Sequence, residues 1–506
     1  MAIRISGMAS GMDTEAMVQD LVKAYKTKGS NYTKQQKRAE LKQDAWKSLN
    51  KKIKSFTTKY TANMQYSTYY ASKKTTVSDS SKASVVSSDG AVTGSQTLEV
   101  DKLATTAYLT GAKISNATGS TKLSELMGGS EFETTIKLNG EEEGFTIDQD
   151  TTIDEFVGFM SAKGFNASFD ENNGRIFISA KNSGAAADFS FDTSDPTAKN
   201  ALVALGLETD TTKTDPELAT YDKNYEGPVK IPGEDAQIKL NGATFANSSN
   251  TFNINGLTIT AKEKTDSAVS ISTETDYDAI YDKIKSFIKD YSSLINEMTE
   301  LYNAPANKGY DPLTDEEKEA LSESEVKKWE DKVNESLLRR DGNLSSLSSI
   351  LRNSMLQTYD FEGTTYSLSS FGINTLSYFS APENERNAYH IDGDPDDSES
   401  SGNTDKLKAA IAANPEAVVN FFTKLSKNMY DQLQEFSKSS SSRSYGSFYD
   451  DKQMKEDIVK YENKVTKWDD YVKSIEDRYY KQFAKMESAM STLNSQQNYI
   501  SSMFGM

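Results

Sequence analysis

The sequence contains no cysteine and a single histidine, His390, among 506 residues. Without cysteine the chain has no disulfides, no thiol nucleophiles and no cysteine–zinc sites. With neither cysteine nor a second histidine, we expect no histidine-based metal site and no catalytic triad. His390 lies beside a strand-like run and is interpreted as a surface or strand-edge residue. The sequence therefore predicts a protein that is not an enzyme and needs no cofactor.

Long apolar runs are also missing. No stretch approaches the ~18 apolar residues of a membrane-spanning helix, so we expect no membrane insertion. The first residues carry one early cation, Arg4, and no apolar core, and Asp13 and Glu15 follow soon after. This pattern does not resemble a secretory signal peptide, so we expect any export to use another route.

Charge is unevenly distributed along the chain. The net charge is -18, yet residues 1–60 contain 13 Lys and Arg against 5 Asp and Glu. The acidic bulk argues against nucleic acid as a partner. For the basic N-terminal segment, the solvated face of a long helix is the simpler interpretation, and an acidic partner surface is the alternative.

The N-terminal region shows helical periodicity in two patches. The second patch has apolar residues three or four positions apart, at Trp46, Leu49, Ile53, Phe56, Tyr60 and Met64. The first patch is formed by Val18, Leu21, Val22 and Tyr25. Between them, residues 26–43 are highly polar and include Gly29, which predicts a weakly held or interrupted helix.

The C-terminal region carries a longer stripe with the same spacing. Its members are Met454, Ile458, Tyr461, Val465, Trp468, Val472, Ile475, Tyr479, Phe483, Met486, Met490, Leu493, Gln497, Ile500 and Phe504. As one helix, this stretch would span ~75 Å, which is too long to bury its stripe on a compact domain. We expect the N-terminal segment to be its partner helix.

The middle of the chain has the short alternating runs of β-strands. Asn-Gly pairs at 139–140, 173–174, 241–242 and 255–256 stand beside such runs and predict hairpins. A short amphipathic helix is expected from Thr151 to about residue 163. The pentapeptide Ile136–Gly140 recurs as Ile238–Gly242, either as a reused hairpin or as a mark of two related β-units.

Helical periodicity returns after residue 277. We expect helices over 278–302, about 314–358 and 404–436, and a flexible connector over 437–445. The predicted fold is therefore a multidomain α+β protein. Long terminal helices form a coiled-coil leg, and a helical-bundle-rich domain and two β-rich head domains lie between them. The expected boundaries are 1–44 with 456–506 for the leg, 45–74 with 276–455 for the helical domain, 75–112 with 222–275 for the first head domain and 113–221 for the second.

Two short motifs resemble functional sites, but their sequences do not favour the functional interpretation. Residues 392–397 have the D-x-D-x-D opening of a calcium loop. Asp397 stands where that loop needs Gly, and Asn403 stands where it needs Glu, so we expect a solvated acidic loop. Gly7 and Gly11 have the spacing of a membrane helix-pairing motif, but their flanks are too polar for it.

Several motifs in order resemble a known family. Ser6–Glu15 (SGMASGMDTE) resembles the opening of the bacterial flagellar filament capping proteins, the flagellar hook-associated protein 2 family. Further blocks match in the family's order: Ala45–Asn50, Gly94–Ala104, Thr151–Lys181, Gly233–Gly242, Ser249–Thr258, Pro312–Thr314, Trp329–Glu330, Leu338–Asp341, Phe371–Ile373, Asn414–Val418 and Met490–Phe504. The acidic residues 392–403 depart from the pattern.

The resemblance implies an extracellular protein at the distal tip of the flagellum. It implies a ring-like homo-oligomer that retains exported flagellin and promotes its folding and polymerisation. It also implies export by the flagellar type III route and a chaperone before secretion. A surface adhesin that binds mucin or glycans through the head domains is one alternative, although Phe132 and Phe145 there are expected in the core. A hook–filament junction protein is another.

The expected assembly residues follow from the stripes and the resemblance. The predicted seam comprises Trp46, Leu49, Ile53, Phe56, Val465, Trp468, Val472, Ile475, Tyr479, Phe483, Met486, Met490, Leu493, Ile500 and Phe504. The predicted N-terminal assembly segment comprises Gly7, Met8, Gly11 and Met12. We expect this segment to be disordered in a free subunit and ordered by a partner.

Overall fold

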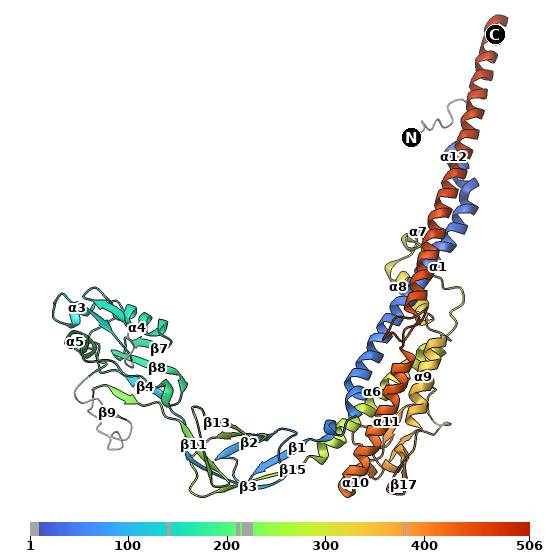
Figure 1. The fold of residues 1–506 in the computed structure, drawn as a ribbon. Coiled ribbons are helices and arrows are strands. Elements are labelled where there is room, and N and C mark those ends of the chain that lie inside the picture. The colour runs from blue at the N-terminus through green and yellow to red at the C-terminus, as the bar shows by residue number, and fades with distance from the viewer. Residues whose placement is uncertain are drawn as a thin grey trace. The chain divides into compact units, whose positions relative to one another are not determined.

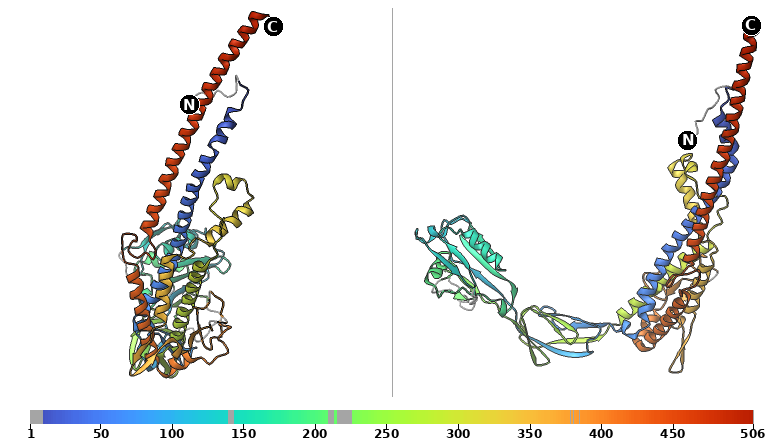
Figure 2. Two further views of the ribbon diagram at one scale, coloured as in Figure 1. Left: turned by 90° about the vertical axis from the view of Figure 1, so that its right-hand side faces the viewer. Right: turned by 45° about the horizontal axis from the view of Figure 1, so that its top comes forward.

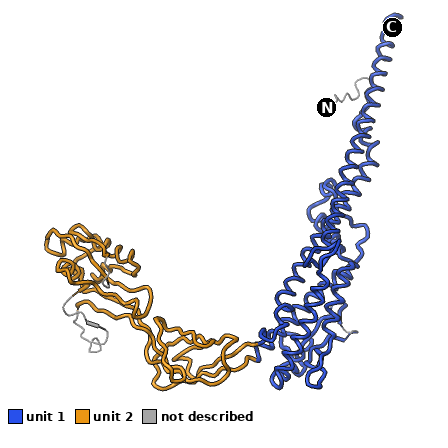
Figure 3. The backbone as a smooth tube through the Cα atoms, in the orientation of Figure 1, with its two compact units in different colours: residues 1–70, 277–506 blue, residues 71–276 orange. Residues whose placement is uncertain are grey.

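The computed structural model of the chain describes residues 10–138, 143–208, 213–214, 226–377, 379, 381–383 and 385–505. Two compact units are present: unit 1 comprises residues 1–70 and 277–506, and unit 2 comprises residues 71–276 (Figure 3). Unit 1 is mainly helical and unit 2 is rich in strands (Figure 1). The predicted α+β class, with long terminal helices and an inserted β-rich part, is confirmed. The finer division into four domains stays a prediction.

The first helix, α1 (Thr14–Phe56), runs without a break for 43 residues. The predicted interruption within residues 26–43 is therefore wrong. Asp13 caps the helix start by accepting the N–H of Ala16 at 3.0 Å. The polar middle of α1 stays helical because it packs on other parts of unit 1, and periodicity along one segment does not report such contacts.

The remaining elements of unit 1 follow α1 or return after unit 2. They are η1 (Thr57–Thr61, a π-helical turn), α2 (Ala62–Met64), η2 (Ser67–Tyr70), α6 (Tyr277–Asn303), α7 (Asp315–Glu319), α8 (Glu323–Glu335), α9 (Gly342–Met355), β16 (Tyr359–Phe361), β17 (Thr364–Tyr366), η5 (Leu368–Phe371), β18 (Ile373–Thr375), β19 (Tyr389–Ile391), α10 (Lys406–Ala413), α11 (Pro415–Phe436) and α12 (Asp451–Phe504). The helices predicted over 278–302, 314–358 and 404–436 are confirmed as α6, as α7 to α9, and as α10 with α11.

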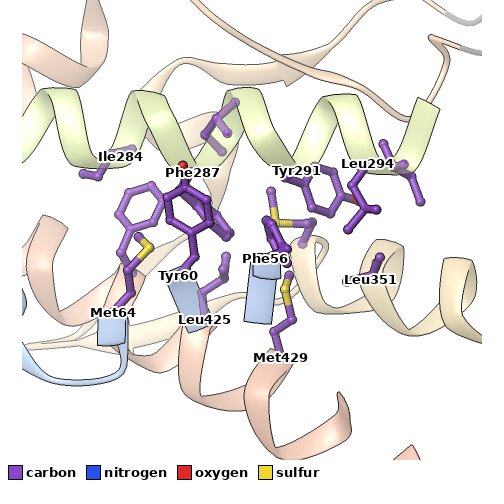
Figure 4. Packing of buried hydrophobic residues seen from close by; sticks show 14 of the residues in the cluster. Phe56, Tyr60, Met64, Ile284, Phe287, Tyr291, Leu294, Leu351, Leu425 and Met429 are labelled. Atoms are coloured by element: carbon purple, nitrogen blue, oxygen red, sulfur yellow. The ribbon is translucent and has the colours of Figure 1, made fainter. Parts of the chain in front are cut away.

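The core of unit 1 is one apolar cluster to which α1, α6, α9 and α11 all contribute (Figure 4). Its centre is aromatic. Phe56 stacks on Phe287 with ring centroids 5.8 Å apart, and Tyr60 meets Phe287 edge-on at 5.7 Å. Burial raises the pKa of Tyr60 to about 12. This cluster fixes the C-terminal third of α1 in place.

The segment between α11 and α12 is anchored, so the expected flexible connector is wrong. Arg443 lies within it, and its guanidinium donates to the carbonyl of Phe436 at 2.6 Å and to Asn343 Oδ1 at 2.7 Å. It also lies 3.1 Å from Asp450 Oδ1. The polar and serine-rich composition of this segment suggested flexibility, but one arginine, whose side chain is only 12% exposed, binds both flanking helices to α9.

One lobe of unit 2 has two sheets that share a buried cluster. The first sheet has the order β1-β15-β3-β11-β12 and the second β13-β14-β2, and all paired strands are antiparallel. The strands are β1 (Lys73–Val77), β2 (Ala83–Ser87), β3 (Gly94–Lys102), β11 (Ala236–Leu240), β12 (Ala243–Asn247), β13 (Thr251–Ile254), β14 (Leu257–Ala261) and β15 (Val269–Thr275). Alternate residues of both sheets fill the space between them.

The other lobe of unit 2 packs helices on a sheet of order β7-β8-β4-β10-β9. Its elements are β4 (Thr106–Thr110), α3 (Leu123–Leu126), β5 (Glu133–Ile136), β6 (Phe145–Asp148), α4 (Ile153–Ala162), β7 (Asn166–Asp170), β8 (Arg175–Ser183), η3 (Ala185–Ala187), α5 (Pro196–Ala204), β9 (Lys213–Thr214) and β10 (Val229–Ile231). The helix expected from Thr151 is α4, whose start is a capping box between Thr152 and Glu155. Phe132 and Phe145 pack against this core, as expected.

Three of the predicted Asn-Gly turns lie in described residues, and each joins paired strands. The pairs at 241–242 and 255–256 have φ of 51° and 81°, and of 46° and 80°, in two-residue hairpins. The pair at 173–174 belongs to a longer loop between β7 and β8. The pair at 139–140 lies outside the described residues.

Candidate assembly surface

The candidate functional surface is the pair of terminal helices, which we call the leg. In the leg, α1 lies along α12, and the two helices are drawn side by side in both views of Figure 2. Buried residues of α1 that lie outside the core are spaced four and seven apart, at Thr14, Val18, Val22 and Gly29. On α12, Val472 and Ile475 are buried. The sequence therefore correctly paired the two termini.

Within the leg, the absence of a side chain at Gly29 leaves a notch that holds the ring of Trp468. A Cβ atom added to Gly29 would lie 2.7 Å from Trp468 Cδ1. The indole Nε1 of Trp468 donates to the carbonyl of Tyr25 at 2.8 Å, and Tyr32 meets the ring edge-on at 5.8 Å. Gly29, interpreted from the sequence as a weak point of the helix, is thus a contact residue. The signal was a lone glycine in α1 facing the only tryptophan of the C-terminal stripe.

A buried carboxylate binds the residues that precede α1. Glu487 of α12 is only 4% exposed. Its carboxylate accepts the backbone N–H of Ser10 at 3.2 Å and also accepts the hydroxyl of Ser10. The positive end of the α1 dipole also stabilises a carboxylate in this position. Periodicity gave no sign of Glu487, because it is a charged residue inside an apolar seam.

Beyond Met490 the stripe of α12 is open to solvent. Every side chain that the structure describes from Ser491 to Met503 is exposed, including Leu493 at 61% and Ile500 at 54%. Tyr479, Phe483, Met486 and Met490, nearer to α1, are half-buried. The described chain therefore covers only the first part of the predicted seam.

The predicted seam residues of α1 lie elsewhere. Trp46, Leu49, Ile53 and Phe56 are buried in the core of unit 1. Trp46 stacks on Tyr449, with ring centroids 5.5 Å apart and planes 6° apart. On α12, Trp468 and Val465 are half-buried. The structure thus separates the predicted set into core residues on α1 and leg residues on α12.

The predicted N-terminal assembly segment is described only in part. Gly7 and Met8 lie outside the described residues, as does the side chain of Phe504. Gly11 has a φ of 69° and is exposed, and Met12 is half-buried. The assembly role of these residues, and of the seam as a whole, stays a prediction.

The acidic loop after β19 is bound to α6. The ammonium of Lys285 lies 2.6 Å from both Asp394 Oδ1 and Asp396 Oδ2. Burial disfavours this ammonium, but the hydrogen bonds to the two carboxylates outweigh burial and raise the pKa of Lys285. Asp394 is buried, so the expected solvated loop is wrong in this part. The ammonium of Lys285 therefore contacts the carboxylates that would bind the cation if the loop were a calcium site.

His390 lies on β19, one strand of a two-stranded sheet, as the sequence predicted. Its Nδ1 is 2.7 Å from Asp397 Oδ2. Burial alone would raise the pKa of Asp397, but the bond to His390 lowers it. Within the described residues, no cluster of three or more His, Asp or Glu is arranged to hold a metal. In that described part of the chain, no helix has both the length and the apolar character needed to cross a membrane.

Comparison with known proteins identifies the family. The profile of the flagellar hook-associated protein 2 N-terminus matches residues 10–107, and that of the C-terminus matches residues 233–495, more than half of the chain. The chain belongs to the flagellar hook-associated protein 2 family. The leg therefore lies largely inside the two family regions, whereas Ile500 lies beyond the second.

Three proteins of known name are similar to the chain. The chain is 26% identical over 447 residues to flagellar hook-associated protein 2 of Halalkalibacterium halodurans, which covers 82% of this chain and 78% of that protein. It is 24% identical over 374 residues to the protein of that name from Thermotoga maritima, which covers 72% and 54% of the two chains. Among solved structures, the D1-D2-D3 domains of the flagellar cap protein FliD of Escherichia coli cover 82% of this chain and 99% of that one, with 17% identity and a TM-score of 0.47.

Proposed function

We propose that the chain caps the flagellar filament. In this proposal it assembles into a ring-like homo-oligomer at the distal tip, retains exported flagellin and promotes its folding and polymerisation. Membership of the flagellar hook-associated protein 2 family supports this function. Export by the flagellar type III route, with a chaperone before secretion, belongs to the same proposal.

The observation that carries the proposal is the open stripe of α12. Leu493 and Ile500 are more than half exposed on a helix that continues well past the start of α1. A helix that extends an apolar stripe away from its own chain favours a partner that covers it. In a ring, each subunit would present one surface to one neighbour and a different surface to the other.

The test replaces the stripe and leaves the rest of the leg unchanged. In a strain that lacks its own cap protein, Leu493→Asp with Ile500→Asp should fail to restore filaments and should release flagellin monomer into the medium. An aspartate in a covered apolar seam is an unpaired buried charge, which packing does not tolerate. The matched control is Ser495→Asp with Ser502→Asp, which adds the same charge about 200° around the helix.

Three readouts complete the experiment. Light scattering of the purified proteins should show an oligomer for the control and a smaller species for the stripe variant. Electron microscopy of labelled protein should place the control at filament tips, which also distinguishes a cap from a junction protein at the filament base. If the stripe variant capped filaments as well as the control, the proposed role of the α12 stripe would be wrong.

A further inference from the structure

The middle of α1 is helical although its sequence offers no apolar stripe there. Toward the N-terminus it packs on α12 through Gly29, and from Trp46 onward it lies in the core of unit 1. Between these points the cations of α1 make polar contacts with a segment distant in sequence. A helix this polar is marginal in isolation, so these contacts bear on whether it stays ordered.

The segment that meets α1 is residues 310–319, which we call the acidic strap. It includes α7, which lies beside α1 in Figure 1. Three ion pairs join a cation of α1 to a carboxylate of the strap: Lys34–Glu317 at 2.5 Å, Lys37–Asp315 at 2.9 Å and Arg38–Asp311 at 3.3 Å. Lys37 and Arg38 also donate to the backbone carbonyls of Leu313 and Tyr310 at 3.3 and 2.9 Å. Each of these three cations of α1 therefore has a carboxylate partner in the strap.

The strap has its own local structure. Thr314 and Glu317 form a capping box at the start of α7. Trp329 of α8 packs on Tyr310 with ring centroids 4.8 Å apart, and its Nε1 donates to the carbonyl of Asp311 at 2.7 Å. None of these contacts involves α1, so they do not require the strap to be attached to that helix.

The attachment of the strap to α1 is exposed to solvent. The side chains of Asp315 and Asp311 are 90% and 63% exposed, and that of Glu317 is 42% exposed. Exposed ion pairs are individually weak and are screened by salt. The strap also forms one wall of a groove of about 630 Å³ between α1 and α12, with Trp468 and Val472 on the opposite wall. Separation of the strap would expose the basic face of α1 and remove one wall of this groove.

We propose that the acidic strap is a displaceable occupant of the basic face of α1. It keeps the middle of the helix ordered and withholds Lys34, Lys37 and Arg38 from an acidic polypeptide segment of a partner chain until that segment replaces it. The chemistry that selects the partner is a run of carboxylates spaced to meet three cations on one helix face. The proposal goes beyond the cap function and does not depend on it.

The first test measures amide exchange along α1 in the full chain. The strap variant is Asp311→Asn, Asp315→Asn and Glu317→Gln. We expect amides of residues 30–42 to exchange about tenfold faster in this variant than in the wild type, as the loss of three exposed pairs allows. In the wild type, raising NaCl from about 50 mM to about 1 M should have a similar effect. Unchanged exchange in both cases would overturn the proposal.

The matched control removes three ion pairs at other places in unit 1. Asp431→Asn, Glu435→Gln and Asp457→Asn change the net charge by the same amount and free the same number of cations, since these carboxylates pair with Lys427, Lys438 and Lys460. Exchange in residues 30–42 should match the wild type in this control. Faster exchange of equal size would show a general charge effect and would overturn the proposal.

The second test uses poly-L-glutamate as the acidic polypeptide. The strap variant should bind it about tenfold more tightly than the wild type or the matched control, because its basic face is open. Adding Lys34→Ala, Lys37→Ala and Arg38→Ala to the strap variant should remove the gain. Equal affinities in the strap variant and the control would show that the strap does not withhold this face.

Discussion

Replacing Gly29 by alanine should loosen the leg, although alanine favours helices over glycine. The new Cβ would lie 2.7 Å from Trp468 Cδ1 and 3.3 Å from its Nε1. Both are closer than an ordinary van der Waals contact, so the ring or the helix must move. The ring is not a free side-chain end, because its Nε1 is bonded to the carbonyl of Tyr25 and its edge meets Tyr32.

The expected magnitude comes from opposing effects. Overpacking costs ~1–3 kcal/mol, and a strained hydrogen bond costs about 1 kcal/mol more. The gain in helix propensity offsets about 1 kcal/mol of this. We expect Gly29→Ala to lower the local stability of α1 by ~1–3 kcal/mol. Gly158 of α4 is the control: an added Cβ there meets no atom within 4 Å, so Gly158→Ala should stabilise α4 by ~0.5–1 kcal/mol.

The assay is amide exchange of residues 20–32 in a double-mutant cycle with Trp468→Ala. Exchange should become faster for Gly29→Ala in the wild type. In the Trp468→Ala background the notch is empty, so the same change should slow exchange. The coupling free energy should be ~2–4 kcal/mol, the sum of the overpacking and hydrogen-bond costs. If Gly29→Ala stabilised α1 by the same amount in both backgrounds, the close contact between Gly29 and Trp468 would be refuted.

Three further outcomes follow from the described contacts. Trp46→Ala should lower the free energy of unfolding of unit 1 by ~3–5 kcal/mol in denaturant melts that are monitored by amide exchange. The exchange rates of amides in unit 2 should stay unchanged, because Trp46 is fully buried in a core that is formed by residues of unit 1. Glu487→Ala should speed exchange of the first residues of α1 without affecting those after Gly29; no change would mean that the bond to Ser10 does not order this end. Burial alone would raise the pKa of Asp450, but its hydrogen bonds to Asn343, Ser442 and Arg443 lower it. A lowered native pKa stabilises the fold above about pH 4, and this stabilisation is lost as the pH falls through the native value. Acid melts of Asp450→Asn should therefore be flatter below about pH 4 than those of the wild type.

Patterns within one segment were sufficient for the long helices and the turns. The spacing of α12 predicts one helix of more than 50 residues, and 54 residues are helical. The Asn-Gly pairs of β11–β12 and β13–β14 require positive φ, which predicts their turns. The capping box of Thr152 and Glu155 likewise marks the start of α4. In each case the deciding contacts are within a few residues along the chain.

Contacts between distant segments could not be read in the same way. An apolar stripe states that a partner exists but not which one. Trp46 and Trp468 occupy similar stripes, yet one lies in a core with α6, α9 and α11 and the other in the leg. The same limit applies to Lys285, whose carboxylate partners lie more than 100 residues away.

The sequence by itself therefore determined the helix periods, the turn positions and the excess of stripe over available partners. The tertiary structure alone decided which partner each stripe meets, that Gly29 is a notch and that the polar middle of α1 is held by the acidic strap. The physical reason is that secondary structure follows from local geometry, whereas partner choice depends on long-range packing and on charges that only folding brings together.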